Sequence, residues 1–140
     1  MKDMSPLKLA NETALDPAPP MVAIVDDDPS VRRSTQRLLW SSGICASAFA
    51  SADELLTSGA LLDADCLLLD VRMPGMDGLT LQHNLAKTGI PVVFLSARAT
   101  EEEERRALQA NAAAFLRKPV SRDALLRAVI GALRNNNQKT

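Results

Sequence analysis

The chain has 140 residues, 46% of them hydrophobic, and a formal net charge of −1 at pH 7. This length suits one domain, and the apolar fraction excludes disordered and fibrous proteins. The balanced charge gives no sign of direct nucleic-acid binding or of an anionic membrane partner, and no apolar run approaches the roughly 18 residues of a membrane span. We therefore expect a single soluble domain that works in the cytoplasm.

The two ends of the chain differ from its middle. Residues 1–20 include a proline-rich run, which disfavours both helix and sheet, so we expect a flexible leader there. Residues 135–140 are almost all polar, which favours a flexible tail. The predicted domain therefore occupies residues 21–134.

The first part of this domain alternates apolar strands with capped helices. Met21–Val25 is a continuous apolar run, and Asp28 can cap a helix that has a proline at its first position and a glycine beyond its end. A second strand is expected at 44–49. Ser51 and Glu54 then have the spacing of a capping box, which predicts a short helix.

The same alternation continues through the rest of the domain. Cys66–Leu69 is a wholly apolar third strand, a helix is expected at 78–86, and a fourth strand at 91–95. Thr100 and Glu103 form another capping-box pattern, which opens a fourth helix of about ten residues. Both halves of the chain therefore follow one strand–helix pattern.

A weaker fifth strand at 112–116 precedes a last helix that Ser121 can cap. The apolar residues of this helix are expected on one face: Leu125, Leu126, Val129, Ile130 and Leu133. Five strand–helix units with apolar strands favour a five-stranded parallel sheet that is covered on both faces. Right-handed crossovers make this a doubly wound, three-layer α/β sandwich, in which ligands bind at the carboxyl ends of the strands.

The residues at these strand ends could form one chemical site. They are carboxylates, a hydroxyl and an ammonium: Asp26, Asp27, Asp28, Asp70, Ser96 and Lys118. Two like charges ~4 Å apart repel by about 4 kcal/mol at an effective dielectric near 20, whereas a whole domain is stable by only ~5–15 kcal/mol. Such a cluster needs a cation, and Mg²⁺ suits a site of carboxylate oxygens.

Each of these residues has a structural explanation when it is taken alone. Asp70 could be a turn residue, and Lys118 could be a solvated surface lysine, so the indication comes from their joint occurrence at strand ends. His83 lies on an expected helix and is assigned no role. Cys45 and Cys66 lack metal-ligand spacing, and we expect both to be reduced.

Four segments resemble the receiver domain of bacterial two-component response regulators, the family of the chemotaxis regulator CheY. They lie at 23–28, 67–78, 92–97 and 115–119, and the second, which runs from Leu-Leu-Leu-Asp through Met-Pro-Gly-Met-Asp-Gly, is the most specific. The first and last helices are similar to those of FixJ-type regulators. The resemblance implies a flavodoxin-like sheet with strand order 2-1-3-4-5.

The resemblance also implies a reaction and a metal site. Asp70 would accept a phosphoryl group from a sensor histidine kinase, and the chain would catalyse its own phosphorylation and dephosphorylation without being an enzyme in the usual sense. Asp27 would bind Mg²⁺ directly together with Asp70, and Asp26 would bind it through water. The backbone carbonyl of Arg72 would complete the protein ligands.

A switch is implied as well. Ser96 and Lys118 would contact the phosphoryl oxygens, and Phe115 would rotate into the space that Ser96 leaves as it moves inward. The changed surface would be formed by the fourth helix, the fifth strand and the fifth helix, where a second copy could form a symmetric dimer. The Lys118–Pro119 bond is expected to be cis.

Two residues depart from the usual pattern of the family. Asn111 stands where a glycine is common, at a position that needs a left-handed backbone, and asparagine is the next-best residue there. Arg72 is a long cation beside the expected phosphoryl group, and we expect it to change the lifetime of the acyl phosphate. No effector sequence follows residue 134, so the domain either acts alone or is the receiver part of a longer regulator.

Two other functions fit parts of the sequence. The pattern Asp26-x-Asp28-x-Ser30 after an apolar strand resembles the nucleophile motif of haloacid-dehalogenase-type phosphatases. Those enzymes also need acidic metal ligands late in the chain, and only Asp123 follows Lys118. A degenerate receiver would bind partners without phosphorylation. Its usual sign is the loss of an acidic or lysine position, and none is lost here.

Overall fold

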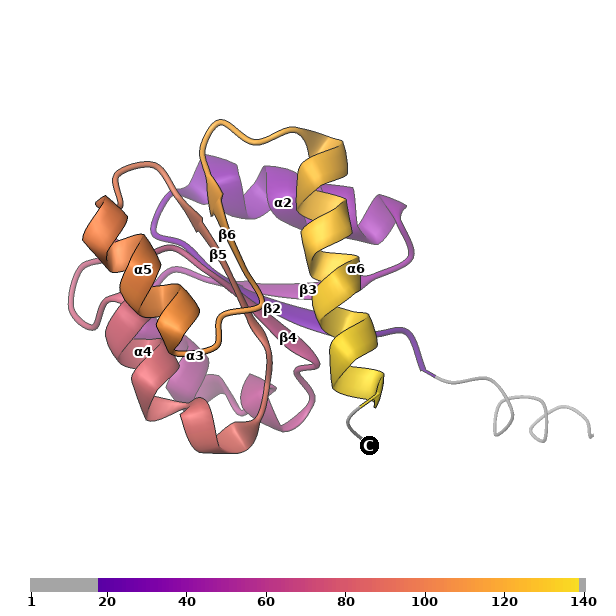
Figure 1. Cartoon of the computed structure of the whole chain (residues 1–140). Helices are drawn as coiled ribbons and strands as arrows, with labels where there is room; N and C mark the ends of the chain where they lie inside the picture. The colour runs from indigo at the N-terminus through magenta and orange to yellow at the C-terminus, as the bar shows by residue number, and fades with distance from the viewer. Residues whose placement is uncertain (1–17, 139–140) are drawn as a thin grey trace, which may run out of the picture.

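The computed structural model describes residues 18–138, so the predicted leader at 1–20 lies almost wholly outside the described residues. The described strands form one five-stranded parallel sheet between two layers of helices (Figure 1). The strands are β2 (Met21–Val25), β3 (Cys45–Phe49), β4 (Cys66–Leu69), β5 (Val92–Ser96) and β6 (Ala114–Arg117). Their order in the sheet, β3-β2-β4-β5-β6, corresponds to 2-1-3-4-5 along the chain and confirms the predicted doubly wound fold.

Two groups of helices cover the two faces of this sheet (Figure 1). One face carries α2 (Pro29–Ser41) and α6 (Arg122–Gln138); the other carries α3 (Ala52–Ser58), α4 (Gly78–Asn84) and α5 (Glu101–Gln109). Short 3-10 turns follow α3 and α4, namely η1 (Ala60–Leu62) and η2 (Ala86–Thr88). Within residues 18–138, no helix is both long and apolar enough to cross a membrane.

The sheet separates two apolar cores, because successive side chains of a strand point to opposite faces. In β4, Leu67 and Leu69 pack with α3, α4 and α5, whereas Cys66 and Leu68 pack with α2 and α6. All four side chains are at most 2% exposed. Burying one leucine contributes roughly 1.5–3 kcal/mol, which explains why a strand that is covered on both faces is apolar throughout.

Capping hydrogen bonds set the starts of three helices as predicted. The Asp28 carboxylate accepts the backbone N–H of Ser30 at 2.9 Å, ahead of the proline that opens α2. Thr100 and Glu103 form the complete capping box of α5. The Ser121 hydroxyl accepts a backbone N–H from the first turn of α6 at 3.0 Å.

The capping box predicted for α3 is only half formed. The Ser51 hydroxyl accepts the N–H of Glu54 at 3.1 Å, as expected. The Glu54 carboxylate, however, accepts the N–H of Ala50 at 2.8 Å, one residue before the cap. The prediction was therefore wrong about the partner of Glu54, because the spacing of the two residues does not specify which backbone N–H the carboxylate can reach.

Several predicted element ends shift by a few residues. β5 runs from Val92 to Ser96, so Ser96 is the last residue of the strand and not the residue after it. α4 ends at Asn84, before its predicted end, and β6 begins only at Ala114. α6 continues to Gln138, into the predicted polar tail. Hydrophobic patterns locate elements well and their ends poorly, since the terminal hydrogen bonds leave little trace in the sequence.

The buried stripe of α6 is narrower than predicted. Leu125, Val129 and Leu133 are buried, at a spacing of four residues, and they pack on the sheet. Leu126 is only partly buried, and Ile130 is 37% exposed. The prediction was wrong for Ile130, because the residue that follows Val129 is turned about 100° around the helix axis, away from the sheet.

The thiols and the unusual backbone positions agree with the sequence. Both cysteines are free; Cys66 is buried, and its burial, with a smaller contribution from the charge of Asp65, raises the pKa of its thiol to about 12. Cys45, by contrast, is only partly buried. Among the described residues, Asn111 is the only non-glycine residue with a positive φ (71°), and the Lys118–Pro119 bond is cis.

Candidate functional site

Three carboxylates meet at the carboxyl ends of the central strands. Asp26 and Asp27 follow β2, and Asp70 follows β4, so the parallel sheet delivers them to one edge. One carboxylate oxygen from each lies within 4.8 Å of the other two. Asp26 is 3% exposed and Asp70 is 8% exposed, whereas Asp27 is exposed. The structure thus brings the predicted acidic cluster together.

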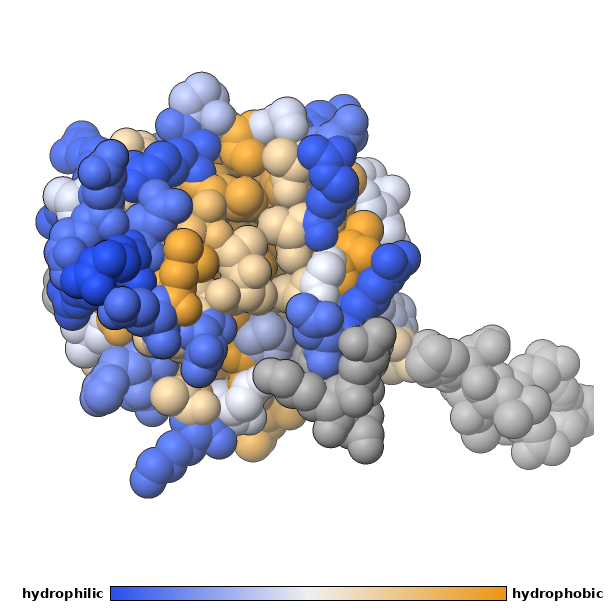
Figure 2. Space-filling model, viewed as in Figure 1, coloured by the Kyte–Doolittle hydropathy of each residue, from blue (hydrophilic) through white to orange (hydrophobic). Residues whose placement is uncertain are grey.

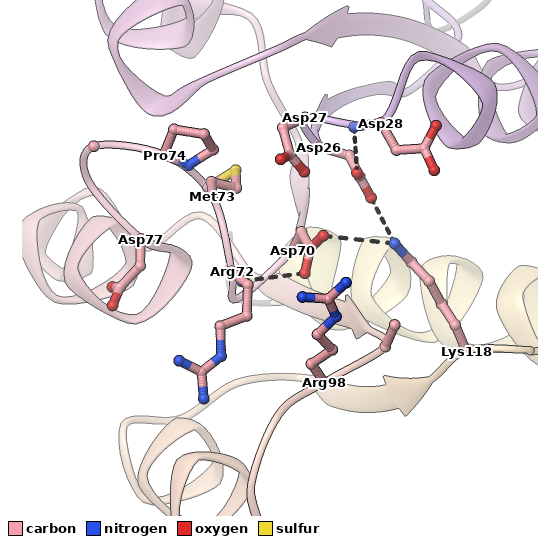
Figure 3. A pocket seen from close by; sticks show the side chains of 12 residues that line it. Asp26, Asp27, Asp28, Asp70, Arg72, Met73, Pro74, Asp77, Arg98 and Lys118 are labelled. Carbon is pink, nitrogen blue, oxygen red and sulfur yellow. Dashed lines mark hydrogen bonds and ion pairs between the residues drawn. The ribbon is translucent and has the colours of Figure 1, made fainter.

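Lys118, which follows β6, supplies a cation to this cluster. Its ammonium donates a hydrogen bond to Asp26 Oδ2 at 3.0 Å and lies 3.5 Å from Asp70 Oδ2 (Figure 3). Burial alone would lower the pKa of Lys118, but the hydrogen bond and charge of Asp26 and the charge of Asp70 outweigh it and raise the pKa. Lys118 therefore stays charged between two carboxylates.

The surroundings of Asp70 disfavour its charged form. Burial and then repulsion from Asp26 raise the pKa of Asp70, although Lys118 and the backbone N–H of Arg72 act against this shift. That N–H donates a hydrogen bond to Asp70 Oδ1 at 3.2 Å. The negative charge of Asp70 is therefore incompletely compensated by the protein, and an additional cation would stabilise it.

The other two carboxylates differ in how far the protein already uses their oxygens. Asp26 Oδ1 accepts the backbone N–H of Asp28 at 2.9 Å, and Asp26 Oδ2 accepts the ammonium of Lys118. Asp27 makes no hydrogen bond or ion pair with the described part of the chain. Hard oxygen ligands are those that Mg²⁺ prefers, so the free oxygens of Asp27, beside those of Asp70, fit this ion.

Ser96 lies near Asp70, at the end of β5, and is 0% exposed. Its Oγ is the only buried side-chain N or O atom of residues 18–135 that lacks a hydrogen-bond partner. The Ser96 hydroxyl makes the smallest of the contributions that lower the pKa of Asp70, but it forms no complete hydrogen bond with that carboxylate. An unsatisfied buried polar group costs about 1–3 kcal/mol, so Ser96 would gain from an oxygen-rich group bound at this site.

Phe115, the predicted switch residue, lies on β6 next to Phe94, and their ring centroids are 5.5 Å apart. It is only partly buried, and the guanidinium of Arg117 lies 5.6 Å from its ring centroid. The same guanidinium donates hydrogen bonds to the carbonyl of Ala99 and to the carboxylate of Glu104, each at 2.7 Å. Phe115 therefore sits beside contacts that join β6 to the start of α5.

A pocket of about 610 Å³ opens over the cluster, and an arginine that the sequence reasoning missed lines it. Arg98 is exposed, lies two residues after Ser96, and points toward Asp70 (Figure 3). Its position just past the end of β5 could have drawn attention to it. The direction of its side chain could not be inferred from the sequence.

Gly78 is a second residue to which the sequence reasoning gave no role. As the first residue of α4, it packs against residues 70–72, and its N–H donates to the carbonyl of Val71 at 2.9 Å. A Cβ at this position would overlap the carbonyl oxygen of Asp70 and lie 3.1 Å from a ring carbon of Phe94. Only a glycine lets α4 approach Asp70 this closely.

Arg72 extends from the same segment toward α5. Its guanidinium forms a 2.9 Å ion pair with Glu103, the residue whose carboxylate also completes the capping box of Thr100. Glu103 is only partly exposed, so the pair is better shielded from water than most surface pairs. A direct ionic contact therefore links the segment that follows β4 to the first turn of α5.

Comparisons with known proteins agree with this geometry. A family model described as "Response regulator receiver domain" matches residues 22–130. Nodulation protein W of Bradyrhizobium diazoefficiens is 38% identical over 121 residues, which cover 85% of this chain and 53% of that protein. The transcriptional regulatory protein FixJ of Azorhizobium caulinodans is 37% identical over 114 residues, which cover 80% of this chain and 54% of that protein. The chain thus spans about half the length of these relatives.

Solved structures show the same fold. A CheY-like receiver domain protein from Methanospirillum hungatei is 26% identical, and the TM-score is 0.79. The match covers 87% of this chain and 99% of that one. These matches favour the receiver interpretation over the phosphatase alternative.

Proposed function

The chain belongs to the response regulator receiver family of two-component signalling, and we propose that Asp70 is the residue on which it accepts a phosphoryl group. Receiver domains are regulators that interact with histidine kinases, so we take a sensor kinase in the cytoplasm as the donor. The observation that carries the proposal is the setting of Asp70. It is a nearly buried carboxylate with an ammonium 3.5 Å away and an unpartnered buried hydroxyl close by.

In the proposed reaction, a carboxylate oxygen of Asp70 attacks the phosphorus atom of a phosphohistidine. The P–O bond forms with an electron pair of the carboxylate, while the P–N bond breaks and its electron pair returns to the imidazole, which takes up a proton. We further propose that the chain itself supplies the catalysis, both for phosphorylation by small donors and for hydrolysis of the acyl phosphate. The donor then needs to provide only the phosphoryl group.

The main obstacle to this attack is repulsion between the carboxylate and the negatively charged phosphoryl oxygens. Lys118 lies where it can offset that charge, and Asp26 holds its ammonium in place through the 3.0 Å hydrogen bond. The N–H of Arg72 fixes Asp70 Oδ1, which leaves Oδ2 on the side of Lys118. These contacts align the nucleophile with its charge partner before any donor arrives.

We assign Mg²⁺ to the carboxylates of Asp27 and Asp70 and to the backbone carbonyl of Arg72, with Asp26 acting through water. The assignment is supported by the spacing of the three carboxylates and by the uncompensated charge of Asp70. When bound there, the ion supplies positive charge that offsets the repulsion between Asp70 and the phosphoryl oxygens. Asp27 is suited to direct contact because its oxygens have no other partner among the described residues.

The phosphoryl group then acts as a conformational switch in this proposal. Its oxygens give the Ser96 hydroxyl the acceptor that it lacks, and Ser96 moves toward them. The vacated space admits the ring of Phe115, which changes the surface formed by α5, β6 and α6. A partner protein would therefore detect phosphorylation by binding this surface, and it would not need to contact the phosphoryl group itself.

We propose that a second copy of the chain binds the same surface. Figure 2 shows apolar atoms gathered between α5 and α6, over β6, with hydrophilic side chains around them. Leu108 on α5 is 47% exposed, and Leu116 on β6 and Leu126 on α6 are partly exposed. Because β6 is an edge strand of the sheet, a symmetric copy could cover this face by isologous contacts.

Intact mass after incubation with acetyl phosphate and Mg²⁺ tests the acceptor. The wild type should gain one phosphoryl mass, and Asp70→Asn should gain none. Asp28→Asn is the matched control, because Asp28 lines the same pocket but serves as a helix cap, which asparagine can also provide. It should be labelled like the wild type, and labelling of Asp70→Asn would refute the assignment.

A further inference from the structure

One guanidinium at the mouth of the acidic pocket has no partner. Arg98 follows β5, is exposed, and makes no ion pair or side-chain hydrogen bond with the rest of the described chain. Figure 3 shows its guanidinium directed toward Asp70, which lines the same pocket. Exposed arginines usually point into solvent, where hydration is best, so this direction needs an explanation.

The other cations that line the pocket are already held by carboxylates. Lys118 is hydrogen-bonded to Asp26 at 3.0 Å, and Arg72 is paired with Glu103 at 2.9 Å. Arg72 therefore extends toward α5, while Arg98 extends toward Asp70 (Figure 3). Of the three pocket-lining cations in residues 18–138, only Arg98 is free to meet an incoming anion.

The charge of the loaded site leaves a role for such a cation. A phosphoryl group carries a charge of about −2, and Asp26 and Asp27 add one negative charge each. Lys118 and a divalent ion together offset three of these four charges. About one negative charge remains uncompensated on the phosphoryl oxygens, and one guanidinium at the mouth of the pocket would balance it.

We propose that Arg98 binds the phosphoryl group, first on the donor and then on Asp70, through charge-assisted hydrogen bonds from its guanidinium. This inference rests on the proposed function and names a further residue for it. The planar fork of a guanidinium matches two phosphoryl oxygens at once, which an ammonium cannot do. Arg72 does not take this role, because Glu103 holds it on the side of α5.

The first test compares Arg98→Gln with the wild type. The apparent KM for acetyl phosphate, followed by intact mass, should rise about tenfold, the loss expected for one charge-assisted hydrogen bond. The Kd for beryllofluoride in the presence of Mg²⁺, measured by calorimetry, should rise by a similar factor. Arg98→Lys should recover part of both losses, because it restores the charge without the fork.

Arg127→Gln is the matched control for this change. Arg127 is an exposed residue of α6 and does not line the acidic pocket. Its substitution by glutamine removes the same charge as Arg98→Gln does. Its KM and Kd should equal those of the wild type. The difference between wild type and Arg98→Gln should also shrink as salt is added, because the guanidinium acts from an exposed position.

A second variant tests why Arg98, and not Arg72, has the role. Glu103→Gln keeps the capping box, since an amide oxygen can still accept the N–H of Thr100, but it releases Arg72 from its ion pair. In the Arg98→Gln background, this change should restore much of the lost affinity for beryllofluoride. The freed Arg72 would then reach the phosphoryl oxygens from the other side of the pocket.

The outcomes separate this inference from the proposed function. If Arg98→Gln and Arg127→Gln behave alike while Asp70 is still phosphorylated, the role of Arg98 is refuted and the acceptor assignment stands. If the wild type gains no phosphoryl mass, both fail together. A selective loss in Arg98→Gln, with recovery on Glu103→Gln, would establish the inference.

Discussion

At the scale of single residues, Asp70 carries a charge that its surroundings oppose. Its pKa is raised by burial and by Asp26, so the native state binds a proton at this carboxyl more readily than the unfolded chain does. As the pH rises through the titration range of Asp70, this group therefore lowers the stability of the fold. Near neutral pH, the charged carboxylate is a net cost unless a cation joins it.

Asp70→Asn should therefore stabilise the metal-free domain near neutral pH. The variant removes a repelling charge while keeping the shape of the side chain, and we expect a gain on the order of 1 kcal/mol in the free energy of unfolding. Urea titrations in the presence of a chelator measure it. The gain should decline in acid, where the wild-type carboxyl of Asp70 is also neutral, and an equal gain at all pH values would contradict the charge explanation.

Asp27 and Asp26 should differ in their effect on Mg²⁺ binding. Both oxygens of Asp26 already accept hydrogen bonds from the protein, whereas those of Asp27 have no partner in the described chain. Asp27→Asn should thus weaken Mg²⁺ binding by about tenfold or more, and Asp26→Asn by less. Isothermal calorimetry can separate the two. A larger loss in Asp26→Asn would show that the direct ligand was assigned to the wrong residue.

The strand-end rule explains which of these residues the sequence could place. It brought Asp26, Asp70 and Lys118 to one edge of the sheet, because parallel strands with apolar interiors leave little choice of topology. The rule did not predict the direction of the Arg98 side chain, because the rotamer of an exposed residue depends on charged groups that other elements place nearby. It also put Ser96 just beyond its strand, although this residue is the last of β5 and is fully buried.

At the scale of elements, helix α5 is held at both ends. Glu103 in its first turn is paired with Arg72, which lies two residues after Asp70. At its other end, the buried Gln82 of α4 donates hydrogen bonds to the carbonyls of Ala107 and Ala110, at 3.0 and 3.3 Å. A shift of α5 on phosphorylation must therefore break these contacts or carry Arg72 and α4 with it.

Gly78→Ala should damage the packing of α4 against the segment that contains Asp70. The new Cβ would overlap the carbonyl oxygen of Asp70 and crowd Phe94, so that the helix or the segment must move. We expect a loss of about 2–3 kcal/mol in the free energy of unfolding, together with weaker Mg²⁺ binding. Gly131→Ala in α6 is the control, because a Cβ there meets nothing within 4 Å. Equal stability of the two variants would refute the close approach.

Elements were more predictable than their contacts. The starts of α2, α5 and α6 followed from apolar runs and capping residues, because these signals are local, whereas the order of the strands came from the resemblance to receiver domains. The outward turn of Ile130 and the different partner of Glu54 depend on how each helix settles against its neighbours. The ion pair between Arg72 and Glu103 joins residues that are 31 positions apart, a distance over which the sequence gives no local signal.

At the scale of the whole molecule, the sheet separates α5, which we expect to respond to phosphorylation, from α2, which we expect to stay unchanged. Helices α3, α4 and α5 pack in one core, whereas α2 and α6 pack in the other. The proposed switch enters through Ser96 and Phe115, which lie on the two strands next to α5. We therefore expect the response to phosphorylation to be unequal across the molecule.

Amide hydrogen exchange with beryllofluoride and Mg²⁺ should reveal this asymmetry. Protection should change from Ser96 to Lys118 and along α5, while α2 should exchange as before. If the apolar face over β6 pairs two copies, light scattering should show a larger dimer fraction under the same conditions. Asp70→Asn should show neither effect. Changes confined to α2 and α3 would refute this route.

The glycine at the start of α4 also bears on how such domains diverge. If Asp70 accepts the phosphoryl group as proposed, position 78 is closed to substitution, because a Cβ there would displace the backbone of Asp70. A lineage that abandons phosphorylation no longer needs that backbone fixed, and larger residues become tolerable once α4 can retreat from the sheet. Relatives that have lost the aspartate should therefore often have lost this glycine as well. A larger residue at position 78 would then indicate a domain that is no longer phosphorylated.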